Sequence, residues 1–127
     1  MSKIPTRSEV DPCFTWNLSD LYPTDDAWKE AYTAAKESPQ RLSDYEGHLS
    51  DNPGTLLDFL RYSDNLSETL DRLGNYAQRK SDEDTRNAVY QEMSALFINL
   101  AIEVNRAAAF STPEILAIPD DVLQNYY

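Results

Sequence analysis

Apolar residues recur at regular spacing over the middle of the chain, between Leu56 and Ala77. They fall into two rows, each repeating every seven residues, in which Ser63 is the only polar position. The apolar members are Leu56, Phe59, Leu66, Leu70, Leu73 and Ala77. Such spacing keeps one side of an α-helix apolar, and Asn52-Pro53 supplies a start signal. The pattern predicts a helix of about seven turns, ~40 Å long at ~1.5 Å per residue.

A second long helix is predicted after a reversal of charge. Arg79-Lys80 place positive charge where a helix should end, and Ser81 to Asp84 place a capping residue and negative charge where one should begin. Apolar residues three or four apart then continue to about Phe110; they are Val89, Met93, Leu96, Phe97, Leu100, Ala101, Val104 and Ala108. The two patterns predict a tight antiparallel hairpin. The residues expected to meet across it are Leu66, Leu70, Leu73, Met93, Leu96 and Leu100.

Shorter helices are predicted before this hairpin. Thr24 can cap a helix, and the two aspartates that follow it interact favourably with the positive end of the helix dipole at the N-terminus. The apolar face after Thr24 comprises Trp28, Ala31, Tyr32 and Ala35. Ser38 is predicted to cap a second short helix, with Pro39 at its first position, Leu42 and Tyr45 on one side, and Gly47 as its stop.

Two further short helices are predicted after the hairpin, one opened by Thr112-Pro113, with Thr112 as a cap, and one by Ile118-Pro119. No alternating pattern of strand length occurs, and the chain has three glycines, so no sheet is expected. The fold class predicted is therefore all-α, with a long antiparallel helical hairpin and shorter packed helices.

The predicted organisation is a flexible or extended lead-in over residues 1–12 and a helical lobe over residues 13–127. The lead-in is polar and contains two prolines. The segment from Asp120 to Tyr127 stops partway through an amphipathic pattern, so the chain is expected to be part of a longer protein. An ordinary C-terminal helix is the alternative.

The chain is strongly acidic, with 22 acidic against 11 basic residues and a formal net charge of -11. Nucleic acids and anionic membranes would repel such a chain, so neither is expected as a partner. One cysteine excludes an internal disulfide, and Met1 is not followed by the apolar core of a signal peptide. No run approaches the ~20 apolar residues of a membrane span. These features predict a cytoplasmic protein.

No catalytic, cofactor-binding or metal-binding residue is predicted in the chain, and substrate contacts are left unassigned. His48 is the only histidine and is followed by Leu49-Ser50, so neither a two-histidine site nor the zinc-protease pattern H-E-x-x-H exists. We expect His48 to be a solvated loop residue. Cys13 is expected to be a buried or incidental thiol, far from a helix N-terminus that would activate it.

Other chemical candidates have structural explanations. Asp82, Glu83 and Asp84 fail the calcium-loop pattern, because Asn87 and Met93 stand where Gly and Glu are needed, and are predicted to cap a helix. The glycines are isolated, so no phosphate loop exists; Gly74, inside the first long helix, suggests a close helix crossing. The tyrosines on helix patterns are expected to pack rather than to form a peptide-binding surface; they are Tyr32, Tyr62, Tyr76 and Tyr90.

Four segments, in this order and spacing, resemble the N-terminal region of the oligoendopeptidase F family of zinc metallopeptidases. They are Thr15–Pro23, the Asp-rich helix with Trp28, the Tyr45–Leu49 turn, and Leu73–Ala77 leading to Ser81–Thr85. None of them is catalytic. The resemblance extends over most of the chain.

The resemblance implies a longer parent protein that hydrolyses short peptides. In the family, a helical N-terminal lobe precedes a catalytic lobe carrying H-E-x-x-H, and the two enclose a channel. The present chain would then form one wall of that channel, with its own C-terminal catalytic domain and an oligopeptide as partners. Zinc would belong to the catalytic domain, which this chain lacks. Two alternatives stay open: a free-standing acidic helical interaction module, and a homodimer that buries the hairpin stripe between chains.

Overall fold

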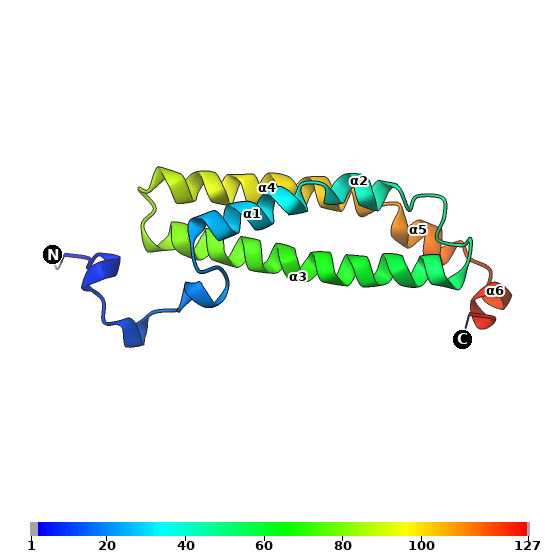
Figure 1. Cartoon of the computed structure of the whole chain (residues 1–127), viewed down its shortest axis with the longest axis horizontal. Helices are drawn as coiled ribbons and strands as arrows, with labels where there is room; N and C mark the ends of the chain where they lie inside the picture. Colours follow the sequence, from blue (N-terminus) through cyan, green and yellow to red (C-terminus); the bar gives the residue numbers. More distant parts are fainter. Residues whose placement is uncertain (1–2, 127) are drawn as a thin grey trace.

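The computed structural model describes residues 3–126, and all regular structure in that range is helical. The predicted all-α class is therefore confirmed. Three short 3-10 helices come first: η1 (Arg7–Glu9), η2 (Pro12–Phe14) and η3 (Leu18–Asp20). The α-helices are α1 (Asp25–Ala35), α2 (Ser38–Ser43), α3 (Pro53–Glu83), α4 (Ala88–Ala108), α5 (Ser111–Leu116) and α6 (Asp120–Gln124). The molecule is elongated, with its two ends far apart (Figure 1).

Helix α3 is the longest helix of the structure and begins where the sequence predicts. The side chain of Asn52 accepts a hydrogen bond from the Thr55 amide at 2.8 Å, and Pro53 occupies the first turn. The 31 residues of α3 give a length of about 46 Å at ~1.5 Å per residue. The predicted end at Lys80 is wrong, because the helix continues through Glu83.

The connection between α3 and α4 is short, and the two helices pack as the predicted antiparallel hairpin. Ser81 is not the cap of the second helix. It lies inside α3, nearly buried, where its hydroxyl accepts a hydrogen bond from the Gln91 side chain at 3.0 Å. The cap of α4 is Asn87, whose side chain accepts from the Val89 amide at 3.0 Å. The predicted capping role of Asp82 and Glu83 is wrong for the same reason, because both are α3 residues.

Helices α1 and α2 follow one another along the hairpin; α1 contacts α3 and α2 contacts α4 (Figure 1). Thr24 caps α1 as predicted, accepting from the Ala27 amide at 3.1 Å. Ser38 does not cap α2. It is the first helical residue, and its buried hydroxyl donates to the Ala35 carbonyl at 2.6 Å. That bond ties the start of α2 to the end of α1.

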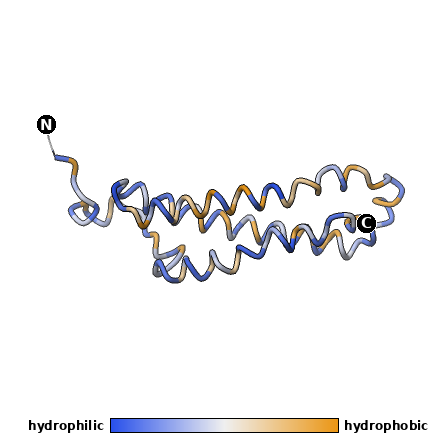
Figure 2. Tube along the Cα trace, turned by 90° about the horizontal axis from the view of Figure 1, so that it is seen from above, coloured by the Kyte–Doolittle hydropathy of each residue, from blue (hydrophilic) through white to orange (hydrophobic). Residues whose placement is uncertain are grey.

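The core lies between the hairpin and α1–α2. Trp28, Leu42, Leu49 and Leu73 are its largest fully buried side chains. The Trp28 indole donates a hydrogen bond to the Leu73 carbonyl at 2.9 Å, which joins α1 to the middle of α3. Of the residues predicted to meet across the hairpin, four are buried and two are half-buried at its edge; the buried ones are Leu66, Leu73, Met93 and Leu100, and the others Leu70 and Leu96. Hydrophobic and hydrophilic positions intermingle along the helices (Figure 2).

Gly74 marks the close helix crossing that the sequence suggests. It is buried, and a Cβ atom built on it would lie 2.5 Å from Cζ of Phe97 on α4. A side chain at this position would therefore overlap the aromatic ring. Glycine allows α4 to approach α3 with the Phe97 ring directly against the helix backbone.

The C-terminal helices fold back onto the turn after α2. Both carboxylate oxygens of Glu114 accept backbone hydrogen bonds at 2.9 Å, one from Gly47 and one from Leu49. Gly47 has a φ of 83°, and it lies in this turn rather than at the end of α2, which stops at Ser43. Thr112 is not the cap of α5 but its second residue. Pro119 precedes α6, as the sequence predicts.

Candidate functional site

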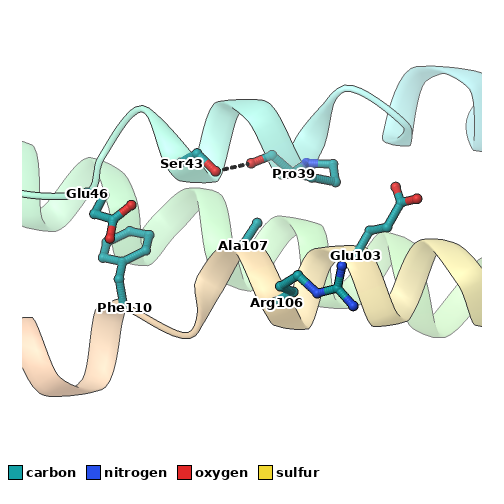
Figure 3. A pocket seen from close by; sticks show the side chains of 7 residues that line it. All are labelled: Pro39, Ser43, Glu46, Glu103, Arg106, Ala107 and Phe110. Carbon is teal, nitrogen blue, oxygen red and sulfur yellow. Dashed lines mark hydrogen bonds between the residues drawn. The ribbon is translucent and has the colours of Figure 1, made fainter.

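A groove between α2 and α4 is lined by charged and aromatic side chains (Figure 3). It has a volume of about 490 Å³, within the range of ligand pockets. Its lining residues are Pro39, Ser43, Glu46, Glu103, Arg106, Ala107 and Phe110. Carboxylates and a guanidinium thus share the groove with the ring of Phe110.

The groove offers polar contacts. The Ser43 hydroxyl donates to the Pro39 carbonyl at 3.0 Å within its own helix (Figure 3), and among residues 3–126 no histidine or carboxylate is hydrogen-bonded to it. A serine nucleophile requires an adjacent general base. Among residues 3–126 no carboxylate lies within 4.0 Å of the Arg106 guanidinium, so that group can pair with an incoming carboxylate.

A polar cluster missed by the sequence analysis joins α1 to the hairpin. The carboxylate of Asp25 accepts from the Tyr76 hydroxyl at 2.6 Å and from the Tyr90 hydroxyl at 3.0 Å. The Lys80 ammonium lies 5.7 Å from the centroids of both rings. Burial raises the pKa of Tyr76, and the hydrogen bond to Asp25 raises it further. A phenol held in its neutral form is a hydrogen-bond donor here, and the cluster links three helices.

His48 lies on the exposed turn between α2 and α3, as predicted. Its Nδ1 is 2.8 Å from the Asp51 carboxylate, three residues away. Within the part of the chain that the structure describes, no three or more His, Cys, Asp or Glu side chains are grouped so that they could hold a metal ion. The residues present therefore do not fit a zinc site, for which three or four ligands are needed.

Cys13 is exposed, so it is not a buried thiol, and its surroundings do not activate it. The side chain of Asp11 accepts a hydrogen bond from the Cys13 amide at 3.0 Å. A hydrogen bond to Asp11 raises the pKa of the Cys13 thiol, and this lowers the thiolate fraction at neutral pH. Of the two predicted alternatives, a buried thiol and an incidental thiol, Cys13 fits the second.

The tyrosines on the helices are packing residues, as the sequence predicts. Tyr76 is buried, and Tyr32, Tyr62 and Tyr90 are half-buried against the core. The Tyr32 ring stacks on Trp28 with centroids 5.3 Å apart, and the Arg41 guanidinium lies 4.3 Å from the Tyr62 ring centroid.

None of the helices described is both long and apolar enough to cross a membrane.

Comparison with known proteins gives the chain its relatives. It is 41% identical over 125 residues to a Bacillus subtilis protein named oligopeptidase PepF, a match that spans 98% of this chain. It is 31% identical over 121 residues to the Lactococcus lactis subsp. cremoris protein named oligoendopeptidase F, plasmid, across 94% of this chain. The chain matches an N-terminal fragment of the oligoendopeptidase F family. The sequence resemblance is thereby confirmed.

The match covers a fifth of these relatives. The chain spans 19% of the Bacillus subtilis protein and 20% of the Lactococcus lactis one. A Streptococcus agalactiae relative named group B oligopeptidase PepB is 28% identical over 120 residues, again with 20% of its length covered. No family model matches the chain, and no solved structure does. The oligoendopeptidase F match thus concerns the helical region described above.

Proposed function

We propose that this chain is the N-terminal helical lobe of an oligoendopeptidase F-like zinc metallopeptidase that hydrolyses short peptides, and that it forms one wall of the substrate channel. The observation that carries the proposal is the 41% identity to oligopeptidase PepF over almost the whole chain. The relatives are named as oligopeptidases or oligoendopeptidases.

The side chains of this lobe suggest which part of the longer protein binds zinc and which part forms the channel wall. Zinc and its ligands belong to the catalytic part of the longer protein, because the single histidine here, His48, has one carboxylate neighbour and no wider ligand set. This lobe contributes a stiff wall. A wall of four packed helices can exclude folded proteins by size, and closure over a peptide can remove water from the reacting bond.

The proposed partners are the catalytic domain of the same polypeptide and an oligopeptide. The groove between α2 and α4 is the proposed peptide contact, since Arg106 is available to a peptide carboxylate and Phe110 to an apolar side chain. The proposed organisation keeps residues 1–12 as a lead-in and 13–127 as the lobe; the lead-in contains the 3-10 helix η1, and Arg7 pairs with Glu83 of α3 at 2.8 Å. The single cysteine suits a reducing compartment, and we place the protein in the cytoplasm.

A free-standing interaction module is the second candidate. The apolar stripe of the hairpin argues against the form of this candidate that uses the stripe to bind a partner. Leu66, Leu73, Met93 and Leu100 are buried within one copy of the chain, so they are not free to hold a partner helix or a second copy. An interaction module would have to use a different surface.

The test is expression of the longer protein encoded by the same reading frame. We expect an H-E-x-x-H motif downstream of Tyr127 and hydrolysis of short fluorogenic peptides that a chelator abolishes. The chain 1–127 alone is the matched control and should cleave none. A stop codon directly after Tyr127, or peptide cleavage by the contaminant-free chain alone, would contradict the proposal.

A further inference from the structure

Two aromatic side chains lie outside the core at the end of the molecule where the chain begins and α3 ends. Phe14 is 79% exposed and Trp16 is 81% exposed. Both line a cavity of about 250 Å³ beside Arg79 and Glu83 of α3, and Trp16 also lines a neighbouring cavity of about 640 Å³. A tryptophan side chain buries about 150–250 Å² when covered. We call Phe14 and Trp16 the aromatic patch.

The backbone under the patch is held in place, although the rings are not covered. The Arg7 guanidinium donates to the Trp16 carbonyl at 3.4 Å and to the Glu83 carboxylate at 2.8 Å, which ties the segment to the end of α3. Two residues later, Leu18 is buried in the core. The backbone that carries the Trp16 ring is therefore tied to α3 and to the core, which lowers the entropic cost of ordering that backbone on binding.

Charge distinguishes this end from the rest of the molecule. Residues 3–20 and 75–87 carry five basic and six acidic side chains, a net charge of -1, whereas the remaining residues carry six basic and sixteen acidic ones, a net charge of -10. Four ion pairs lie at this end: Lys3–Glu9, Arg7–Glu83, Arg79–Asp82 and Arg86–Asp84. Its charges are therefore matched within the chain, and an apolar partner surface meets no net repulsion there.

We infer that the aromatic patch is the docking surface for the rest of the longer polypeptide, with Trp16 as its anchor. The inference rests on the proposed function, since the chain spans 19–20% of the relatives it matches and the occupant is the part beyond it. The surface of the longer polypeptide that covers Phe14 and Trp16 is apolar. It needs no charged groups, because the charges around the aromatic patch are already paired within this chain. Aromatic anchors in desolvated pockets dominate the energetics of such interfaces.

A second copy of this chain is a poorer occupant. Each copy carries a net charge of -11, so two copies repel one another at neutral pH. A segment of the same polypeptide is held nearby at a high effective concentration and does not depend on encounter between separate molecules.

The test is fast hydroxyl-radical labelling of the longer protein, read by mass spectrometry at Trp16 and at Trp28. Trp28 is fully buried and gives the rate of a covered indole in the same molecule. We expect Trp16 to be labelled nearly as slowly as Trp28 in the longer protein, and much faster than Trp28 in the chain 1–127. Rapid labelling of Trp16 in the longer protein would overturn the inference. Protection of Trp16 in the chain alone that increases with concentration would assign the patch to a second copy, which also overturns it.

A matched pair of variants tests whether Trp16 anchors the contact. Leu116 has the same exposure as Phe14, 79%, and lies at the opposite end of the molecule on α5 (Figure 1). In the longer protein, Trp16→Ala should raise the labelling rate of Phe14, and Leu116→Ala should leave it unchanged. Peptidase activity is recorded on the same samples. A longer protein without peptidase activity but with Trp16 protected would refute the proposed function alone, and an active protein with Trp16 freely labelled would refute the docking surface alone.

Discussion

Gly74→Ala tests how closely the two long helices approach. In an open helix this change should stabilise the protein by about 1 kcal/mol, because alanine has the higher helix propensity. At this position the new methyl group would lie 2.5 Å from Cζ and 2.7 Å from Cε1 of Phe97. Both distances are well inside the ~3.5 Å at which carbon atoms begin to attract. The helices or the ring must therefore move.

The magnitude follows from the two opposing effects. Overpacking a core costs about 1–3 kcal/mol, and the helix gain offsets about 1 kcal/mol of it. We expect a net loss of about 1–2 kcal/mol in the free energy of unfolding, measured by urea titration with circular dichroism. In a Phe97→Ala background the ring is gone, so the same Gly74→Ala change should stabilise the protein by about 1 kcal/mol.

The reversal of sign between the two backgrounds is the decisive outcome of this double-mutant cycle. Ser67→Ala, at an exposed position of α3, is the control for helix propensity alone and should have the same small effect in both backgrounds. Equal stabilisation by Gly74→Ala with and without the Phe97 ring would refute the close crossing and the helix packing derived from it.

Four further predictions concern stability and chemistry. Leu73→Ala, at a fully buried position, should lower the free energy of unfolding by about 2–5 kcal/mol, whereas exposed Glu68→Ala should change it by less than ~0.5 kcal/mol; equal small effects in urea melts would place Leu73 outside the core. Glu114→Gln should cost about 1–2 kcal/mol, because one of the two backbone amides at the Gly47–Leu49 turn then faces an amide donor; an unchanged urea midpoint would contradict this. The raised pKa of Tyr76 keeps its phenol protonated in the fold where the unfolded phenol ionises, near pH ~10, so the contribution of Tyr76 to stability should be constant below that pH and fall above it; Tyr76→Phe should make the fall of stability at alkaline pH less steep, and an equally steep fall in the variant would count against the cluster. Calorimetry of the chain 1–127 with zinc at neutral pH should show no sub-micromolar site, and a tight site would contradict the ligand count.

The hairpin could be predicted because its signals are local. Spacing of three, four and seven residues fixes an apolar helix side, and Asn52 and Thr24 cap helices because their side chains reach amides three residues on. Ser81 shows where such signals fail. A serine followed by acids resembles a helix start, but tertiary contact with Gln91 keeps Ser81 inside α3.

The long-range polar contacts of the structure could not be predicted, because they join residues far apart in sequence. Glu114 binds a turn 65 and 67 residues earlier, and Asp25 binds hydroxyls 51 and 65 residues later. No spacing rule connects such pairs. The exposure of Trp16 could not be predicted either, because an aromatic residue just before a helix is expected to pack in the core.

The most direct test of the account compares the longer protein with a version lacking Met1 to Tyr127, on a short fluorogenic peptide and on unfolded casein. The account predicts that the shortened enzyme, even if it folds and keeps its zinc motif, loses most of its peptide hydrolysis or begins to digest casein, because the channel has lost a wall. Matching rates for both versions on both substrates would contradict it.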